Sequence, residues 1–232
     1  MKNRAEMTIL EHFEELRQRL LKAIIALVIG VIVGTFLTPP VLKRLVAPLG
    51  DQVPLAISPT EAAAVFFKVA VVIGVVLAMP VILYQVFQFV RPGLEPHERR
   101  YVIIGAPAAA LSFAVGVIFA AVVLLPAALP FLQGFLFGIV EQRYSIDRYI
   151  SFVSNVLLWA GLVFETPLVM YFLAKLGVVP PQAFAKARRV VIIGAAIGAA
   201  VITPTTDPVN MLLVMVPFLL LYEVGILLAR LA

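Results

Sequence analysis

Residues Gln85 to Arg100, QVFQFVRPGLEPHERR, form a short polar connection between two long apolar runs. The flanking runs cover about residues 66–90 and 101–125, and about 20 apolar residues in a helix are enough to cross a hydrocarbon core of about 30 Å. Two such runs joined by a short polar turn predict antiparallel transmembrane helices, with the turn at one membrane surface. The rest of the chain repeats this arrangement.

The composition indicates a protein that resides in the membrane along its whole length. Of the 232 residues, 62% are hydrophobic and 13% are charged, which exceeds the apolar share of a soluble domain. The chain has no cysteine, so it has neither a disulfide framework nor a thiolate metal site. Its net charge of +5 comes from basic residues at the ends of apolar runs, where membrane topology explains them and nucleic-acid binding is not indicated.

The apolar runs predict an all-α, polytopic protein in which residues 1–232 form a single integral membrane domain. An amphipathic helix over residues 8–19 begins with a Thr8–Glu11 capping box and leads into the first span. Prolines inside several spans should bend them into a cupped bundle, and the last two spans have short apolar runs. The six predicted spans cover about residues 20–38, 66–90, 101–125, 149–174, 190–203 and 209–229.

The distribution of lysine and arginine predicts the orientation of the chain. Thirteen of the 18 basic residues fall before the first span, in the 91–100 and 175–189 loops, and at the C-terminus. By the positive-inside rule, both termini are cytoplasmic and the loops at 38–65 and 126–148 face the opposite side. Small-residue spacings at Gly30-x-x-x-Gly34 and Gly194-x-x-x-Gly198 favour close helix packing over partner binding.

Residues of the usual catalytic types are nearly absent. His12 and His97 lie outside the predicted spans without a matching second ligand. The sequence contains neither the H-E-x-x-H nor the G-x-S-x-G spacing, and it has no glycine-rich phosphate loop. We therefore predict a protein that is not an enzyme, with no metal and no cofactor.

Glu165 is an acidic residue in the middle of the fourth predicted span. It lies ten residues before Lys175, about 15 Å from the end of its helix at about 1.5 Å per residue. An acidic residue at mid-membrane costs about 2.5 to 3.5 kcal/mol, so Glu165 needs a partner, a proton or a wet cavity. It is either a protonated glutamate bonded to a neighbouring helix or a functional group, and the second is favoured.

Two carboxylates are predicted at the cytoplasmic edge, and each has a structural explanation. Glu98 falls in the first turn of the third span, where the helix dipole favours an anion. Glu15 can pair with Arg19 at i,i+4. The residues alone do not decide between these contacts and a carboxylate pair that awaits a cationic ligand.

Six stretches of the sequence carry a family resemblance. In order they are Phe13-Glu-Glu-Leu-Arg-Gln-Arg19, Val46-Ala-Pro-Leu49, Pro80-Val-Ile-Leu-Tyr-Gln85, Phe89 to Arg100, Phe164-Glu-Thr-Pro167 and Thr203-Pro-Thr-Thr-Asp207. Together they closely resemble the TatC subunit of the twin-arginine protein translocase. The match extends from residue 8 to 230 and agrees with the six-span layout. One departure is Met211, where many relatives carry a glutamine, so a polar contact to partner helices is in question there.

The resemblance implies a receptor and core subunit that exports folded proteins bearing twin-arginine signal peptides across the cytoplasmic (inner) membrane, driven by the proton gradient. It implies that Glu15 and Glu98 engage the arginine pair, with Arg17 and Phe89 in the same surface. A guanidinium donates a two-pronged hydrogen bond to a carboxylate that a lysine does not reproduce.

The resemblance also implies an oligomeric complex with single-span partners of the TatA and TatB type. Glu165 and the fifth span would face these partners within the lipid bilayer, while Pro48 and Asp207 would shape the caps on the trans side. The chain ends without a charged cytoplasmic tail, so no contact that depends on such a tail is expected.

A six-span secondary transporter that relays protons through Glu165 is the alternative from another functional class. Such a transporter would show internal repeats and paired broken helices. The two halves of the sequence show no self-similarity, which favours the translocase subunit.

Overall fold

The computed structural model describes residues 9–50, 53–91, 99–134, 143–202 and 208–232. Within these residues the chain is helical apart from short connections and one isolated bridge between Leu55 and Ser145, which confirms the all-α prediction. The helical elements are α1 (Ile9–Val46), η1 (Ala47–Leu49), α2 (Glu61–Val90), α3 (Arg99–Phe119), the π-helical turn η3 (Ala120–Leu124), α4 (Leu125–Gly134), α5 (Ile146–Phe164), α6 (Thr166–Lys175), α7 (Pro181–Ile202) and α8 (Pro208–Arg230).

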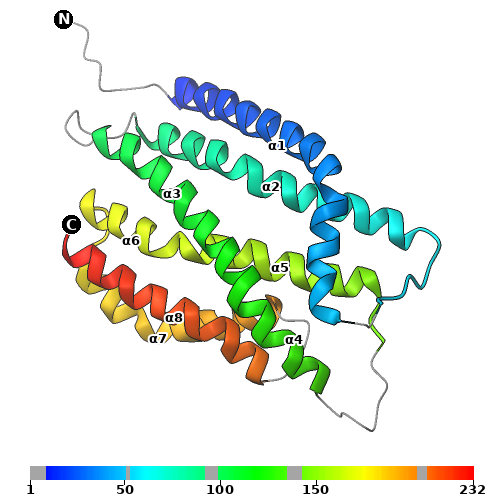
Figure 1. Cartoon of the computed structure of the whole chain (residues 1–232). Coiled ribbons are helices and arrows are strands. Elements are labelled where there is room, and N and C mark those ends of the chain that lie inside the picture. Colours follow the sequence, from blue (N-terminus) through cyan, green and yellow to red (C-terminus); the bar gives the residue numbers. More distant parts are fainter. Residues whose placement is uncertain (1–8, 51–52, 92–98, 135–142, 203–207) are drawn as a thin grey trace, which may run out of the picture.

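The helices run back and forth between two ends of the molecule (Figure 1). At the end that we call the terminal face, α1, α3 and α7 begin, and α2, α6 and α8 end. At the opposite end, the far face, α1 and α4 end and α2 and α5 begin. Five helical stretches of the described chain are long and apolar enough to cross a membrane: residues 10–49, 61–90, 103–134, 146–175 and 211–230.

The N-terminal helix is longer than the sequence suggests. The predicted amphipathic helix and first span are one uninterrupted helix of 38 residues, with no break near residue 19. Pro39 and Pro40 lie inside this helix, and Figure 1 shows its C-terminal part turning away from the rest, as prolines within a helix cause. Residues 39–46, which the sequence places in a loop, therefore continue the helix.

The fifth predicted span also belongs to a longer helix. The α7 helix begins at Pro181 and has 22 residues. Its first turns contain polar residues that precede the apolar run at 190–203, so the sequence placed them in a loop. Lys186, Arg188 and Arg189 fall in this part, so α7 is absent from the stretches that composition alone identifies as membrane-spanning.

The first two helices lie side by side at very short range (Figure 1). A Cβ atom on Gly30 would lie 2.5 Å from the carbonyl oxygen of Gly74, and one on Gly34 would clash with the carbonyl oxygen of Ala70. The first glycine pair therefore packs within the molecule, as predicted. Cβ atoms on Gly194 and Gly198 would meet nothing within 4 Å, so the second pair faces open space.

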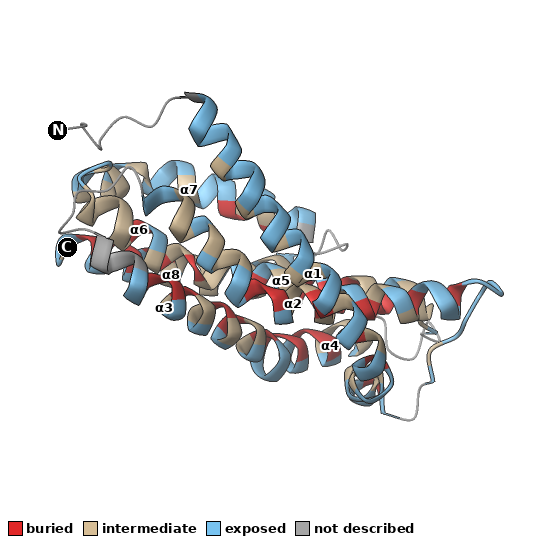
Figure 2. Ribbon diagram, turned by 90° about the horizontal axis from the view of Figure 1, so that it is seen from above, coloured by how far each residue is buried: buried red, intermediate tan, exposed pale blue. Residues whose placement is uncertain are grey.

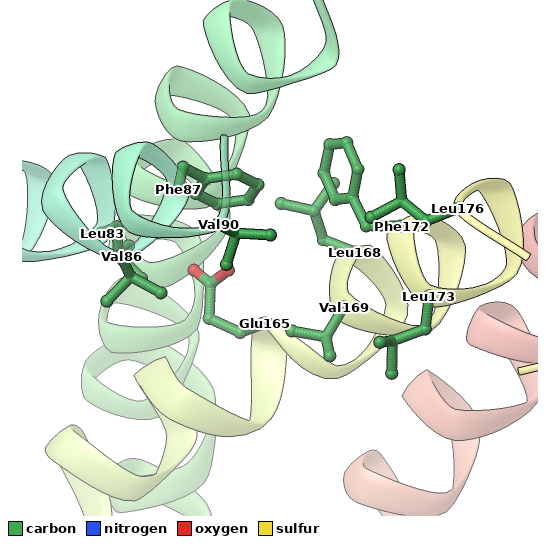
Figure 3. A pocket seen from close by; sticks show the side chains of 10 residues that line it. All are labelled: Leu83, Val86, Phe87, Val90, Glu165, Leu168, Val169, Phe172, Leu173 and Leu176. Carbon is green, nitrogen blue, oxygen red and sulfur yellow. The ribbon is translucent and has the colours of Figure 1, made fainter. Parts of the chain in front are cut away.

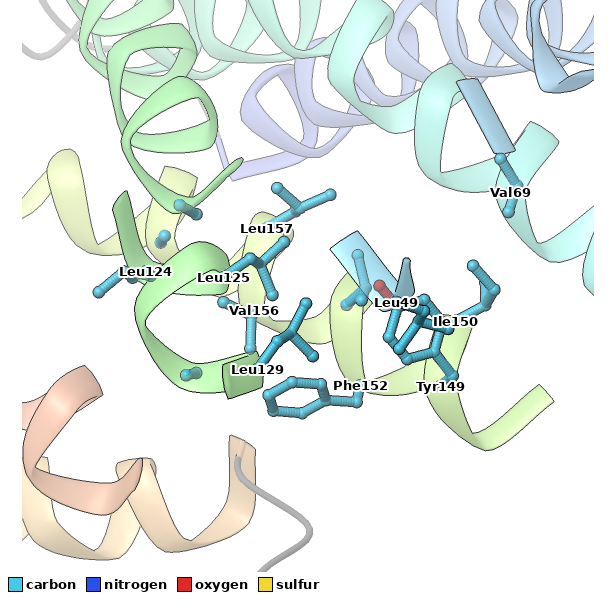
Figure 4. Close-up of a cluster of buried hydrophobic side chains, with 14 of the residues drawn as sticks. Leu49, Val69, Leu124, Leu125, Leu129, Tyr149, Ile150, Phe152, Val156 and Leu157 are labelled. Carbon is cyan, nitrogen blue, oxygen red and sulfur yellow. The ribbon is translucent and has the colours of Figure 1, made fainter. Parts of the chain in front are cut away.

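Most of the buried residues lie on α2, α3, η3, α4 and α5, whereas α1 is largely exposed (Figure 2). The main apolar cluster lies toward the far face, where Ile150, Val153 and Leu157 of α5 pack with Leu124 and Leu129 (Figure 4). The Tyr149 hydroxyl donates to the carbonyl oxygen of Leu45 at 2.6 Å. The end of α1 is thereby attached to α5.

Candidate functional site

A polar cluster at the terminal face joins α1 to α2. Arg19 donates from Nε and Nη2 to the same oxygen of Glu15, Oε1, at 3.0 and 2.6 Å. Its remaining nitrogen, Nη1, lies 3.4 Å from the Gln85 side-chain oxygen on α2. Glu15 and Arg19 are one helical turn apart on the face of α1 that meets α2, so the contact predicted as i,i+4 pairing is formed.

The Glu15 carboxylate is well shielded although it lies near the end of the molecule. Its side chain is 14% exposed and that of Arg19 is 22% exposed. The second oxygen of Glu15, Oε2, is buried and has no hydrogen-bond partner among the described residues. A carboxylate can accept about four hydrogen bonds, so Oε2 has unused capacity for another donor, which reaches it only after the side chains around it move.

Phe89 lies, like the Glu15–Arg19 pair, at the interface between α1 and α2. Its ring stacks on the imidazole of His12, with ring centroids 4.5 Å apart and planes 27° apart. His12 precedes Glu15 by three residues on α1, so Phe89, His12 and Glu15 occupy adjacent turns. The sequence did not reveal the stacking, because the two rings come from helices that only the fold brings together.

Arg17 is not part of this cluster. Its side chain is 72% exposed and contacts Glu14 at 3.5 Å, on a different side of α1 from Glu15 and Arg19. Two residues along a helix correspond to a rotation of about 200°, which directs Arg17 away from α2. Glu98 lies outside the described residues, between the end of α2 and the start of α3 at Arg99.

Glu165 occupies a break between two helical stretches. The α5 helix ends at Phe164 and α6 begins at Thr166, with Pro167 in its first turn. Ser112 of α3 donates to the Phe164 carbonyl oxygen at 2.7 Å, which binds the break to the neighbouring helix. The side-chain oxygen Oε1 of Glu165 is buried and has no partner among the described residues.

The Glu165 carboxylate faces an apolar cavity of about 210 Å³ between α2 and α6 (Figure 3). Glu165 is the one polar residue among the described residues that line it. The others are Leu83, Val86, Phe87, Val90, Leu168, Val169, Phe172, Leu173 and Leu176. A carboxylate with an unused oxygen in such a cavity is suited to a hydrogen-bond donor on an apolar partner.

Of the two residues predicted to shape the far side, Pro48 and Asp207, the structure describes Pro48. Pro48 lies in the short η1 helix, exposed, just before the buried Leu49 and before Gly50 with its positive φ of 62°. It therefore lies where the chain leaves α1. Asp207 lies outside the described residues.

A second polar cluster, at the far face, was not predicted. Glu61 at the start of α2 accepts hydrogen bonds from the backbone N–H groups of Ile57, Ser58 and Asp147 and from the Ser145 hydroxyl. The spacing of Ser58 and Glu61 is that of a capping box, so the local half of this contact had a sequence signal. The half that reaches Ser145, 84 residues away, had none.

Lys68 extends this far-face cluster by about two turns of α2. Its ammonium group pairs with Asp147 and donates to the Ser151 hydroxyl at 2.7 Å. Among the described residues, no group of His, Asp and Glu side chains has an arrangement that could hold a metal ion. Together, the contacts of Glu61 and Lys68 join the start of α2 to the start of α5.

Comparison with known proteins gives consistent matches over nearly the whole chain. The family model described as Sec-independent protein translocase protein (TatC) matches residues 11–217. The TatC protein of Carboxydothermus hydrogenoformans is 37% identical over 226 residues, which cover 97% of this chain and 93% of that protein. The TatC protein of Aquifex aeolicus is 38% identical over 232 residues, with 97% and 96% covered.

The fold is also that of a solved structure. The crystal structure titled Twin Arginine Translocase Receptor TatC matches with a TM-score of 0.87 and 37% sequence identity. The match covers 95% of this chain and 99% of that one. The similarity therefore includes the helices that carry both polar clusters and Glu165.

Proposed function

The chain belongs to the TatC family of Sec-independent protein translocase proteins, and we propose that it is the subunit that recognises twin-arginine signal peptides. As a member of this family it is a multi-pass membrane component of a protein translocase and not an enzyme. The family assignment thereby replaces the alternative of a small-solute transporter.

The observation that carries the proposal is the occupied Glu15 carboxylate. Arg19 shows that a guanidinium fits against Glu15 with N–H donors at 2.6 and 3.0 Å. The carboxylate is largely shielded from solvent, where an ion pair is stronger than at an exposed position. A signal-peptide arginine would therefore find both the charge and the geometry that it requires.

The preference for arginine over lysine follows from the shape of the two cations. A guanidinium presents two parallel N–H donors to the two oxygens of a carboxylate, whereas an ammonium is a compact, strongly hydrated charge. We propose that Glu98 provides the second carboxylate and that Phe89 provides the apolar wall beside them. Arg17, which is directed away from α2, would act at the rim of the site.

The partner surfaces form a second part of the proposal. The outer face of α7 carries exposed Val190, Ile193, Ile197 and Val201, and Gly194 and Gly198 on α7 leave open space for another helix. Single-span subunits of the TatA and TatB type would pack there in an oligomeric complex. Glu165 would bond a polar group of a partner helix, and Pro48 and Asp207 would shape the far-face caps.

The orientation belongs to the same proposal. Because most basic residues fall at the terminal face, this face would be cytoplasmic and the protein would reside in the cytoplasmic (inner) membrane. The site around Glu15 then faces the compartment from which substrates come. As the family resemblance implies, movement of the substrate would be driven by the proton gradient.

The test is a binding measurement on the purified protein in lipid nanodiscs. A fluorescent signal peptide with an Arg-Arg pair should bind at least about tenfold more tightly than the same peptide with Lys-Lys. The two-pronged guanidinium–carboxylate hydrogen bond that lysine cannot form contributes about 1.5 kcal/mol or more to binding. The Glu98→Gln variant should lose most of this preference. Equal binding of both peptides by the wild-type protein would contradict the proposal.

A further inference from the structure

The carboxylate of Glu15 is closed to an incoming ligand in this structure. Arg19 covers Oε1 with two N–H donors, and Oε2 is buried without a partner among the described residues. A signal-peptide arginine that needs both oxygens therefore meets one that is occupied and one that is shielded. The side chains have to rearrange before a peptide can bind.

The resident group and the proposed ligand have the same chemistry. Each is a guanidinium, and Arg19 places two N–H donors on Oε1. A peptide guanidinium that bonds both oxygens of Glu15 needs this same oxygen. If both stayed, two like charges would be held on either side of one carboxylate in a poorly hydrated place, which is unfavourable. Exchange of one guanidinium for the other avoids this cost.

We propose that Arg19 is an internal competitor, which occupies Glu15 in the absence of a signal peptide and leaves when the peptide arginine binds. The inference rests on the proposed function, because it assigns a role to Arg19 at the same site. The exchange needs no change of the backbone, since Arg19 and Glu15 lie on the same helix. Apart from Glu15, the one hydrogen-bond contact of Arg19 within the described part of the chain is long, 3.4 Å to the neutral Gln85 side chain, so Arg19 can leave by rotating its side chain.

The competition has a defined effect on affinity. A resident group that must be displaced lowers the apparent affinity of every ligand for Glu15 by the same factor, as for any fractionally available binding state. The ratio of Arg-Arg to Lys-Lys binding is unchanged, but the absolute affinity of both falls. Peptides that carry a more weakly binding pair, such as Lys-Lys, in place of Arg-Arg then bind too weakly to remain at the site.

The Arg19→Lys variant tests the proposal because it keeps the positive charge and removes the pair of guanidinium N–H donors that bond Glu15. Lysine pairs less well with the Glu15 carboxylate, so the variant should bind the Arg-Arg peptide about three- to tenfold more tightly than the wild-type protein. The Lys-Lys peptide should gain by the same factor. The melting temperature, measured in parallel, should stay within about 2 °C, because lysine keeps a positive charge beside Glu15 at this half-buried position.

Two further variants separate competition from simple charge repulsion. Lys22→Gln removes one positive charge from the next turn of α1, where Lys22 is exposed, and should change affinity less than Arg19→Lys does. Arg19→Gln should bind at least as tightly as Arg19→Lys. Unchanged or weaker binding by both Arg19 variants, in folded protein, would overturn the proposal, because it would mean that Arg19 only positions Glu15. If the wild-type protein itself does not prefer Arg-Arg, the proposed function fails instead.

Discussion

Two carboxylates at opposite ends of the seam around α2 are bonded in opposite ways. Glu61, at the far face, accepts two hydrogen bonds on each oxygen, all from neutral donors of the protein. Glu15, at the terminal face, uses one oxygen for Arg19 and leaves the other buried and unpaired among the described residues. A carboxylate whose hydrogen bonds are all formed within the protein joins parts of the fold, whereas one with an unused oxygen can still bond a ligand once the side chains around it move.

Glu165 belongs with Glu15 in this comparison. One of its oxygens is also buried without a partner among the described residues, and the cavity beside it is otherwise apolar. Buried polar groups are hydrogen-bonded in the great majority of cases. Four side-chain atoms of the described residues are exceptions, and the other two belong to Gln133 and Ser154. The two carboxylate oxygens each lie beside a proposed binding surface, which is consistent with ligands or partners that complete their bonding.

The largest effect is expected for Glu61→Ala. The substitution leaves the Ser145 hydroxyl and three backbone N–H groups without their acceptor and separates the start of α2 from that of α5. The melting temperature should fall by about 5 to 10 °C, measured in detergent by the fluorescence of Trp159, the single tryptophan. The matched control Glu15→Ala should shift it by less than about 2 °C. Equal shifts would remove the distinction between the two carboxylates.

A smaller effect is expected for Lys68→Met, which keeps most of the side-chain volume. It leaves Asp147 without its ammonium partner. Both side chains are more than a third exposed, so solvent partly screens the ion pair. The melting temperature should fall by about 2 to 4 °C. Adding Asp147→Asn should restore part of the loss, since neither charge then remains alone. No recovery would show that the two side chains are not coupled.

Glu165→Gln should have the smallest effect on stability. It replaces a carboxyl group that the described structure leaves partly unsatisfied with a neutral amide of similar shape, so the melting temperature should stay within about 2 °C or rise. Export of a twin-arginine substrate in cells should nevertheless be reduced, because the amide bonds a partner helix less strongly. A fall in melting temperature as large as that of Glu61→Ala would show that Glu165 is bonded within the protein.

Local patterns in the sequence predicted the features that depend on residues a few positions apart. The apolar runs identified all the helices that carry the site, and the spacing of Glu15 and Arg19 predicted their pair. Pro167 marked the helix break beside Glu165. The Gly30 and Gly34 spacing indicated the close packing of a helix, although not that α2 was the neighbour.

The features that sequence reasoning missed depend on distant residues or on the ends of helices. Glu61 and Ser145 are 84 positions apart, and no periodicity relates them. His12 and Phe89 stack only because α1 lies along α2. The first span was predicted to end near residue 38, where its apolar run stops, but α1 continues through Pro39 and Pro40 to Val46. Beyond these prolines the Tyr149 hydroxyl donates to the Leu45 carbonyl oxygen, a contact between distant residues.

The most direct test of the account is the affinity of the Glu15→Gln variant for an Arg-Arg signal peptide. Glutamine keeps the shape of the side chain and removes the charge, so affinity should fall at least about tenfold while the melting temperature is retained. The control Glu14→Gln changes the neighbouring, more exposed carboxylate and should leave binding nearly unchanged. If Glu15→Gln binds the peptide as tightly as the wild-type protein does, the Glu15 carboxylate is not the arginine site and the account is contradicted.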